Sequence, residues 1–585
     1  MATLSNEDIA RIFEKMSRVL ALKEKDRFRI LAYEKAAQAI RDLDEDLSAI
    51  SAAGRLDEIG GIGKDLAAKI EEALRTGHIV KCEQECRSIP DSLLQLFEVR
   101  GLGPKTIAIL HESFHVNDFH DLQRAVDSGV LVDAPGFGEK KIDSIRESLK
   151  SWVASHARML LGLALPQAEE LAQQIRKLPN VSHAELAGSI RRGRENIGDV
   201  DLLITSEDSA RVLNDISQLP AIDRVLALGP TRATLLIGDI QVDVRAVALE
   251  CFGAALQYFT GSKQHNTHLR LLARQRGMKI NEYGVFRNDK KLGGAEEEDV
   301  YRLLDMPFIP PELREDRGEI EAALKGTLPE LIELKSIRGD LHVHTTYSDG
   351  RSSISEMIER ASKIGYEYLA LTDHSPSERV ARGLDTVRLQ KKMQELTKIC
   401  KRPNGAGTRA LLGAEVDILP DGSLDYSDDV LARFDVVVAA VHAQFHQSSQ
   451  EMTARILKAI DNPYVNVLAH PTTRLIGTRD PVSFDFEQVV SAAKKAGVAL
   501  EINGSPWRLD LNDTLARTAQ EAGSLFAIGS DAHSATQLSF MRFGVLQARR
   551  GWIHPASVVN TWPLEKLHGW LQERRPKKAR RQHSA

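Results

Sequence analysis

Two aspartates separated by one residue, Asp199 and Asp201, lie in the apolar run from Gly198 to Ile204. If this run forms a strand, both carboxylates leave the same face and lie a few ångströms apart. Two like charges held so close need a cation, and hard oxygen ligands suit Mg²⁺ or Mn²⁺. A pair of such ions can activate an attacking hydroxyl and neutralise a leaving pyrophosphate. The spacing therefore predicts a site of metal-assisted phosphoryl transfer.

Polar residues on either side extend this predicted site. The dipeptide Gly188-Ser189 offers backbone N–H groups and a hydroxyl to a triphosphate, and the dipeptide Arg191-Arg192 offers charge-assisted hydrogen bonds. Residues 240–245 alternate apolar and polar side chains, which predicts a neighbouring strand. Asp243 lies in this strand and is the expected third carboxylate.

A second set of metal-binding residue types follows residue 338. Seven short apolar runs alternate there with helical or loop stretches, which predicts a parallel sheet or barrel. Most of these runs carry His, Asp or Glu near the carboxyl end, where barrels place their chemistry. The nine candidate ligands are His342, His344, Asp349, His374, Glu415, His442, His470, Asp531 and His533. A catalytic zinc uses about three protein ligands, so this set predicts two or three ions.

Three Gly-apolar-Gly turns interrupt the helical periodicity of the first 150 residues. They are Gly61-Ile62-Gly63, Gly101-Leu102-Gly103 and Gly136-Phe137-Gly138, and each is followed by a lysine: Lys64, Lys105 and Lys140. Such a turn lets the backbone approach a phosphate, while the positive end of the next helix faces it. The repeat predicts binding of DNA phosphates without sequence preference.

The three aspartates and the glycine-serine-arginine stretch resemble the nucleotidyltransferase palm of family X DNA polymerases, the DNA polymerase beta relatives. The glycine turns resemble helix-hairpin-helix motifs. The first resemblance implies that Asp199, Asp201 and Asp243 are catalytic and hold two Mg²⁺ or Mn²⁺ ions. It also implies nucleotide-binding roles for Gly188, Ser189, Arg192, Gly198, Tyr258, Phe259, Gly261, Asn266 and Arg270.

The family X resemblance places Lys69 where the eukaryotic repair enzyme keeps its lyase nucleophile. There an amine forms a Schiff base with an abasic sugar, which requires a lowered lysine pKa. The alternative is that Lys69 only contacts phosphate, and the sequence leaves both interpretations open.

The nine C-terminal ligands resemble those of the PHP (polymerase and histidinol phosphatase) domain, a seven-stranded barrel with a trinuclear centre. This resemblance implies two or three Mn²⁺ or Zn²⁺ ions and phosphoesterase chemistry, because clustered ions can clamp and hydrolyse a phosphate ester.

The expected fold is multidomain, α+β and α/β. It comprises a helical helix-hairpin-helix N-terminal region, a nucleotidyltransferase palm and a C-terminal PHP (β/α)7 barrel. The predicted parts are a lyase-like helical domain (1–85), a helix-hairpin-helix subdomain (86–150), the palm (151–250), a nascent-base-pair-binding subdomain (251–324), a linker (325–337), the PHP domain (338–570) and a disordered basic tail that starts at Arg574 within residues 571–585.

Composition sets wider bounds on the chain. Its 585 residues allow several domains, and a net charge of −5 neither favours nor excludes nucleic acid, because binding depends on local basic patches. Four cysteines form no disulfide framework. The first residues predict a capped amphipathic helix and not a signal sequence, and no apolar run is long enough to span a membrane. A cytoplasmic monomer is expected.

The leading interpretation is a DNA polymerase for gap filling in DNA repair, whose PHP domain removes 3' nucleotides or 3' blocking groups. Its partners would be gapped or primed DNA and deoxynucleoside triphosphates. One alternative is a nucleotidyltransferase for RNA or small molecules fused to a small-molecule phosphatase. Another is a DNA-end-binding scaffold with one or both sites silent.

Overall fold

The computed structural model describes residues 6–23, 26–41, 47–87, 89–99, 102–131, 134, 137–138, 140–146, 149, 158–238, 240–288, 290–400 and 407–576. Gly101 and Gly136, named above, and the tail residues Lys577, Lys578, Arg580 and Arg581 lie outside the described residues. The chain divides into two compact units, Met1–Ala157 and Arg158–Ala585.

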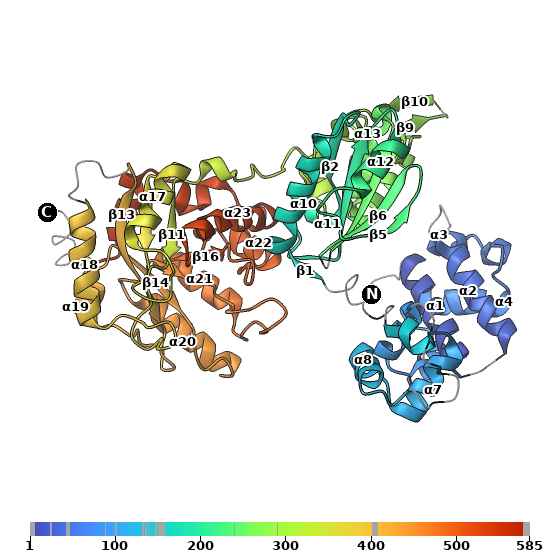
Figure 1. Ribbon diagram of the computed structural model, residues 1–585, viewed down its shortest axis with the longest axis horizontal. Coiled ribbons are helices and arrows are strands. Elements are labelled where there is room, and N and C mark those ends of the chain that lie inside the picture. Colours follow the sequence, from blue (N-terminus) through green and yellow to red (C-terminus); the bar gives the residue numbers. More distant parts are fainter. Residues whose placement is uncertain are drawn as a thin grey trace. The chain divides into compact units, whose positions relative to one another are not determined.

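The first unit is helical (blue in Figure 1). Apolar residues recur at spacings of three and four, so each helix buries one face; α1 buries Ile9, Phe13, Met16 and Leu20 in this way. The helices are α1 (Asn6–Leu22), α2 (Arg27–Arg41), α3 (Leu47–Ala52), α4 (Lys64–Thr76), α5 (Val80–Cys86), α6 (Asp91–Gln95), α7 (Pro104–Phe114), α8 (Phe119–Asp127) and one over residues 140–146. They enclose two apolar cores, one around Phe13 and Ile70 and one around Leu102 and Ile145.

The second unit begins with a five-stranded sheet of order β2-β4-β7-β6-β5. Its strands are β2 (His183–Leu186), β4 (Asp199–Thr205), β5 (Arg224–Leu228), β6 (Arg232–Ile237) and β7 (Ile240–Val247), with helices α10 (Leu161–Arg176), α11 (Gly188–Arg191) and α12 (Ser209–Ser217). The short strands β1 (Met159–Leu160) and β3 (Asn196–Ile197) pair beside it. β4 and β7 are parallel, and the other pairs in the five-stranded sheet are antiparallel.

Residues 252–324 form a smaller α+β part. A three-stranded antiparallel sheet, in the order β10-β9-β8, packs with four helices. The elements are α13 (Phe252–Thr260), α14 (Lys263–Gln275), β8 (Lys279–Asn281), β9 (Gly284–Arg287), β10 (Lys290–Gly293), α15 (Glu297–Arg302) and α16 (Glu319–Leu324).

The rest of the unit is a parallel barrel of seven strands in sequential order, β11 to β17. Hydrogen bonds from His344 N to Ala532 O and from Asp531 N to His342 O join its first and last strands, so the barrel is nearly closed. The strands are β11 (Gly339–Val343), β12 (Tyr368–Leu371), β13 (Arg409–Asp417), β14 (Val436–Ala440), β15 (Val467–Leu468), β16 (Ala499–Asn503) and β17 (Phe526–Gly529).

Helices alternate with the barrel strands and cover the barrel (Figure 1). They are α17 (Ile354–Ile364), α18 (Thr386–Cys400), α19 (Asp428–Leu431), α20 (Ser449–Asp461), α21 (Phe486–Ala496), α22 (Asp513–Glu521), α23 (Met541–Arg550) and α24 (Leu564–Glu573). The strands are buried on both faces, as in other parallel barrels. A helical N-terminal part, an α+β middle and a C-terminal seven-stranded barrel confirm the predicted fold class.

The five-stranded sheet and the barrel share a junction. Leu509 and Phe543 of the barrel are buried in the apolar core of the sheet. The segment predicted as a linker, 325–337, packs against the barrel, because Ile332 and Ile337 are buried in the barrel core.

The prediction of a disordered tail is wrong for its first two residues, Arg574 and Arg575. Arg575 is 1% exposed and donates to Asp435 O and Phe434 O, and Arg574 donates to Val465 O and Ile460 O. Both guanidinium groups donate hydrogen bonds to carbonyl oxygens of the barrel. The prediction failed because a run of positive charges looks the same in the sequence whether its arginines are solvated or bound to the folded domain.

Candidate functional site

The paired strands β4 and β7 bring the three predicted carboxylates together. Asp201 and Asp243 are direct partners in the parallel register, and Asp199 lies two residues before Asp201, opposite Gln241. Since side chains alternate along a strand, Asp199, Asp201 and Asp243 share one face of the sheet. Asp243 is further held by hydrogen bonds from Thr234 Oγ1 at 2.6 Å and from Arg232 Nη2 at 2.8 Å.

The three carboxylates repel one another in the absence of a cation. Burial, together with the negative charges of Asp199 and Asp243, raises the pKa of Asp201 to about 7. Burial and Asp243 also raise the pKa of Asp199. Burial opposes ionisation of Asp243 as well, but the hydrogen bonds from Thr234 and Arg232 outweigh it and lower the pKa of this group. A divalent cation would relieve this repulsion.

The glycine-serine-arginine stretch lies against Asp201. Gly188 has a φ of +65°, and a Cβ at this position would fall 2.4 Å from Asp201 Oδ2, so only glycine fits. Ser189 follows in the short helix α11. Arg191 forms two hydrogen bonds of 2.7 Å with Glu297. Arg192 donates its Nε–H to Glu315 at 3.1 Å and its Nη1–H to Thr260 O. Gly198, which precedes β4, has open space around its Cα.

The remaining predicted nucleotide-binding residues lie on α13, on α14 and between them. Tyr258 and Phe259 form an edge-to-face pair, with ring centroids 5.2 Å apart. A Cβ on Gly261 would come within 3.1 Å of Arg192 Nη1. The amide of Asn266 donates to Tyr258 O and accepts from Gln257. Arg270, one turn further along α14, contacts Asn266 O. In this conformation the Asn266 amide is engaged within the protein.

The described parts of the Gly-apolar-Gly turns repeat one geometry. The middle residue of each turn, Ile62, Leu102 or Phe137, is buried in a core of the first unit. The last glycine, Gly63, Gly103 or Gly138, is exposed, and its Cα faces open space. Gly63 and Gly103 have matching backbone angles at the N-termini of α4 and α7. Gly61 has a φ of +94°, and Lys64, Lys105 and Lys140 are exposed.

Lys69 is nearly buried on α4, at 5% exposure. Its Nζ forms an ion pair with Asp65, one turn earlier, and lies 5.9 Å from the centre of the Tyr33 ring. Tyr33, Arg29 and Lys64 line an adjacent cavity of about 320 Å³.

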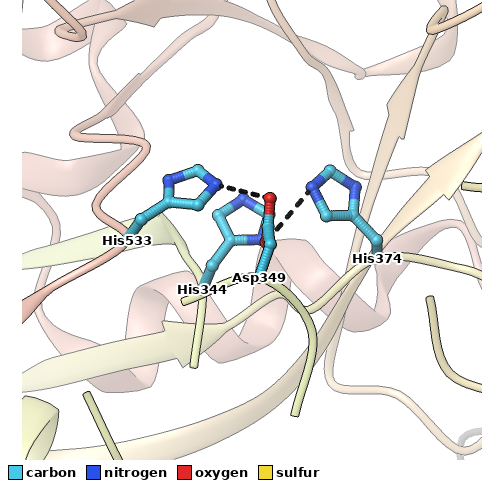
Figure 2. Close-up of side chains that lie close together, drawn as sticks. All are labelled: His344, Asp349, His374 and His533. Atoms are coloured by element: carbon cyan, nitrogen blue, oxygen red, sulfur yellow. Dashed lines mark hydrogen bonds and ion pairs between the residues drawn. The ribbon is translucent and has the colours of Figure 1, made fainter. Parts of the chain in front are cut away.

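At the carboxyl ends of the barrel strands, the nine predicted ligands meet in one cluster. Figure 2 shows Asp349 between the rings of His533 and His374, with His344 beside it. Asp349 Oδ2 lies 3.2 Å from His533 Nε2, and Asp349 Oδ1 lies 3.7 Å from His374 Nε2. Potential ligand atoms of the four residues drawn all lie within 4.8 Å of one another.

Glu415 joins the other histidines to this group. Its Oε1 lies 2.9 Å from His470 Nε2 and 3.2 Å from His442 Nε2. Its Oε2 lies 3.1 Å from His374 Nδ1 and 3.3 Å from His342 Nε2. Asp531 Oδ1 completes the set at 3.3 Å from His344 Nε2.

The chemistry of this cluster fits divalent metal ions. Within the described chain, ring nitrogens of His342, His344, His374 and His470 are buried without a hydrogen-bond partner. Burial and the neighbouring His533 and His374 lower the pKa of His344 to about 4, which leaves it a neutral imidazole able to bind a metal. Burial lowers the pKa of His442, but Glu415 and Asp417 together outweigh it and raise the pKa to about 10.

Three functional candidates escaped the sequence prediction. Glu501 is buried and contacts His342 Nδ1 at 2.6 Å, and Asp417 accepts from His442 Nδ1, so each fixes the ring of a predicted ligand. Arg508 lines the cavity above the cluster. Asp417 lies two residues after Glu415 on a strand, a spacing that could have indicated it. No comparable local signal marks Glu501 or Arg508.

Four segments of the chain match known protein families. Residues 4–79 match a helix-hairpin-helix domain, and residues 93–151 match a SAM-like helix-hairpin-helix tandem. Residues 255–315 match the DNA polymerase beta thumb, and residues 340–505 match the PHP domain. These matches agree with the helical turns of the first unit, with α13 and α14, and with the barrel.

Individual relatives give the same assignment. The rat DNA polymerase lambda is 26% identical over 328 residues, which cover 50% of this chain and 53% of the relative. A probable phosphatase of Thermoanaerobacter sp. (strain X514) is 30% identical over 249 residues, covering 41% of this chain and 96% of the relative. The DNA polymerase/3'-5' exonuclease PolX of Bacillus subtilis (strain 168) is 36% identical over 574 residues, covering 97% of this chain and all of the relative. The chain therefore belongs to the PolX family of DNA polymerases, which join helix-hairpin-helix and polymerase parts to a C-terminal PHP domain.

Proposed function

We propose that this chain is a DNA polymerase that fills gaps during DNA repair and that its barrel removes nucleotides from 3' ends. The register of β4 and β7 carries the first assignment, because it sets Asp199, Asp201 and Asp243 on one face beside a glycine that only just clears Asp201. The resemblance to a DNA polymerase/3'-5' exonuclease over nearly the whole chain supports both activities.

In the polymerase site, Asp199, Asp201 and Asp243 would hold two Mg²⁺ or Mn²⁺ ions. When bound, such ions activate the primer hydroxyl and neutralise charge on the triphosphate. Gly188 lies against Asp201, and Ser189 and Arg192 follow it in the chain, so backbone N–H groups, a hydroxyl and a guanidinium would orient the phosphates. Tyr258 and Phe259 would pack against the sugar of the nucleotide.

In the barrel, the nine ligands from His342 to His533 would hold two or three Mn²⁺ or Zn²⁺ ions. His-rich sets of this kind favour these ions over Mg²⁺, whereas the carboxylate site accepts Mg²⁺. When bound, the ions supply the charge that phosphate-ester hydrolysis requires. Glu501 and Asp417 orient His342 and His442, so they would keep the ligand rings in place.

The exposed glycine turns would bind the DNA backbone, with Lys64, Lys105 and Lys140 at the helix starts. No described helix has the length and apolar character needed to cross a membrane. Cys82 and Cys251 form no disulfide bond, which is consistent with a reducing cytoplasm. A monomer would suffice, since the residues named for each site come from one chain.

Primer extension on a single-nucleotide gap tests the first activity, and shortening of a labelled 3' end without nucleotides tests the second. We expect Asp243→Ala to abolish extension and keep shortening, and His344→Ala to do the reverse. Extension by the Asp243→Ala protein, or shortening by the His344→Ala protein, would count against the respective site.

A 5'-deoxyribose-phosphate lyase activity is a second candidate. The nearly buried Lys69, beside Tyr33 and a cavity lined by Arg29 and Lys64, favours it. The ion pair with Asp65 opposes it, because the nucleophilic amine must be free to attack the sugar and this contact engages Lys69 Nζ. Borohydride trapping on a 5'-deoxyribose-phosphate end distinguishes a lyase nucleophile from a residue that only contacts phosphate. A trapped adduct that disappears in Lys69→Ala supports the lyase. If the wild-type protein forms no adduct, Lys69 remains a phosphate contact.

A further inference from the structure

Arg508 stands apart from the other residues that line the barrel cavity. This cavity, of about 350 Å³, is lined by ligands of the histidine and carboxylate cluster, by Glu378 and by two small apolar residues. Among its described lining residues, Arg508 carries the permanent positive charge. A cation in the lining of a site built to hold cations requires an explanation.

The protein leaves the Arg508 guanidinium only partly satisfied. Its Nε lies 3.6 Å from Asp531 Oδ2, which is beyond hydrogen-bond distance, and its side chain is 17% exposed. Its Nη1 is buried and has no hydrogen-bond partner among the described residues. A buried donor of a charged group that has no partner is unfavourable. The geometry therefore leaves room for a partner from outside the protein.

The surroundings indicate that this partner is an oxyanion. With two or three divalent ions on the ligands, Arg508 would face like charges across the cavity. An anion placed between them would interact favourably with both sides. A guanidinium offers parallel N–H donors that match two oxygens of a phosphate, whereas a water molecule would relieve none of the repulsion.

The chain fixes Arg508 in this position. It lies on the loop between β16 and α22, where Arg508 N and Leu509 N both donate to Ser505 O, and Ser505 N donates to Asn503 Oδ1. Leu509 is buried in the core of the five-stranded sheet, and its carbonyl accepts from Arg474. Because the backbone of Arg508 is already ordered, only the side chain has to be fixed when it binds a ligand.

We propose that Arg508 binds the non-bridging oxygens of the phosphodiester that the barrel hydrolyses. This proposal rests on the proposed exonuclease function and identifies the group that orients its substrate. In the reaction, a water oxygen bonds to phosphorus, and the bond from phosphorus to the O3' of the preceding nucleotide breaks. That O3' takes up a proton, and the products are a nucleoside 5'-monophosphate and a strand shortened by one residue. Arg508 keeps its proton throughout and stabilises the charge on the phosphoryl oxygens.

The test compares Arg508→Ala and Arg508→Lys with the wild-type full-length protein. Arg379→Ala is the matched control, because Arg379 is exposed and lies between Glu378 and Val380, which line the cavity while Arg379 does not. Four quantities are measured: bound metal by elemental analysis, the inhibition constant of inorganic phosphate, kcat/KM for a labelled DNA 3' end, and kcat/KM for the p-nitrophenyl ester of thymidine 5'-monophosphate.

We expect Arg508→Ala to lower kcat/KM on both substrates by about 100- to 1000-fold, as for loss of one donor to a developing charge. It should weaken phosphate inhibition by at least tenfold and leave metal content and gap filling unchanged. Arg508→Lys should recover part of the loss, and Arg379→Ala should change each value less than threefold.

Several results would overturn the proposal. One is an unchanged inhibition constant for phosphate. Another is a loss of bound metal together with activity, which would make Arg508 a support for Asp531. A third is an effect on DNA but not on the small diester, which would place its contact elsewhere on the strand. Absence of 3' shortening by the wild-type protein would instead refute the proposed function, and phosphate inhibition of small-diester hydrolysis would still test Arg508.

Discussion

Replacing Arg550 with alanine should destabilise the second unit more than any exposed substitution. Arg550, at the end of α23, is 4% exposed and connects the barrel with the polymerase part. Its Nη1 donates to Arg192 O at 2.7 Å and to Glu315 Oε1 at 3.0 Å, and its Nη2 donates to Asp513 Oδ2 at 2.5 Å. Alanine would leave two largely buried carboxylates and one carbonyl without this partner.

Breaking a buried ion pair from one side costs about 3–5 kcal/mol. Unfolding entropy is about 2.1 cal/mol/K per residue, so for a unit of about 430 residues this cost lowers the midpoint of thermal unfolding by about 3–6 °C. Burial raises the pKa of Asp513 and of Glu315, but the surrounding arginines together outweigh it and keep both below the usual range: Arg550 and Arg317 for Asp513, and Arg550, Arg192 and Arg194 for Glu315. Lowered carboxylate pKa values contribute stability above the unfolded pKa and lose it as the pH falls. The penalty of Arg550→Ala should therefore be fully present above about pH 5 and shrink as the pH falls below about 4.

Thermal unfolding followed by circular dichroism at pH 7 and at about pH 3.5 measures this effect. Arg433→Ala, which removes an exposed barrel arginine, is the control and should change the midpoint by less than about 1 °C, as surface substitutions do. Adding Glu315→Gln and Asp513→Asn to Arg550→Ala should restore part of the loss, because neutral amides are cheaper to bury unpaired. A midpoint within 1 °C of wild type for Arg550→Ala, or a triple variant less stable than the single one, would refute this account.

Three further outcomes are expected. Gly188→Ala should lower gap filling by about 100-fold, since its Cβ would displace the Asp201 carboxylate, while 3' shortening continues; normal extension would show that Asp201 tolerates the shift. In the metal-free protein, the Asp201 pKa of about 7 means that Mg²⁺ must displace a proton at lower pH. The affinity of the protein for Mg²⁺, measured by calorimetry, should fall by up to about tenfold per pH unit below 7. An affinity that is equal at pH 6 and pH 8 would contradict the assignment of Asp201 as a metal ligand. Replacing Lys64, Lys105 and Lys140 together by alanine should reduce the slope of log Kd for gapped DNA against log salt by about 3, and an unchanged slope would exclude these lysines as phosphate contacts.

Local patterns predicted the parts of this chain that depend on strand alternation. Asp199 and Asp201 share a face because side chains alternate along β4, and the alternation around Asp243 indicated β7 as a neighbour. The histidines of the barrel follow or end its strands, so the rule that chemistry lies at the carboxyl ends of barrel strands brought them together in advance. The seven strands themselves were also evident as apolar runs.

Contacts between distant segments could not be predicted in this way. Glu501 in the run VALEIN reads as one polar residue of a strand, and only the closed barrel brings it to His342, 159 positions earlier. Arg574 and Arg575 have the composition of a solvated tail, and their carbonyl partners lie more than 100 positions away. Long-range partners of this kind depend on the folded topology and leave no local periodicity.

The shared junction also affects how the two activities can be separated in the laboratory. A truncation after residue 324 would uncover the side of the sheet core that Leu509 and Phe543 fill, and it would leave Arg192 O without the donor it has in Arg550. The isolated barrel would in turn lose Glu195 as the partner of Arg474, which steadies the loop of Arg508. If a truncated protein is inactive, the cause can therefore be the loss of the neighbouring part. Such a result does not show that the removed part held the active site. Single substitutions in the intact chain are the cleaner way to assign each activity.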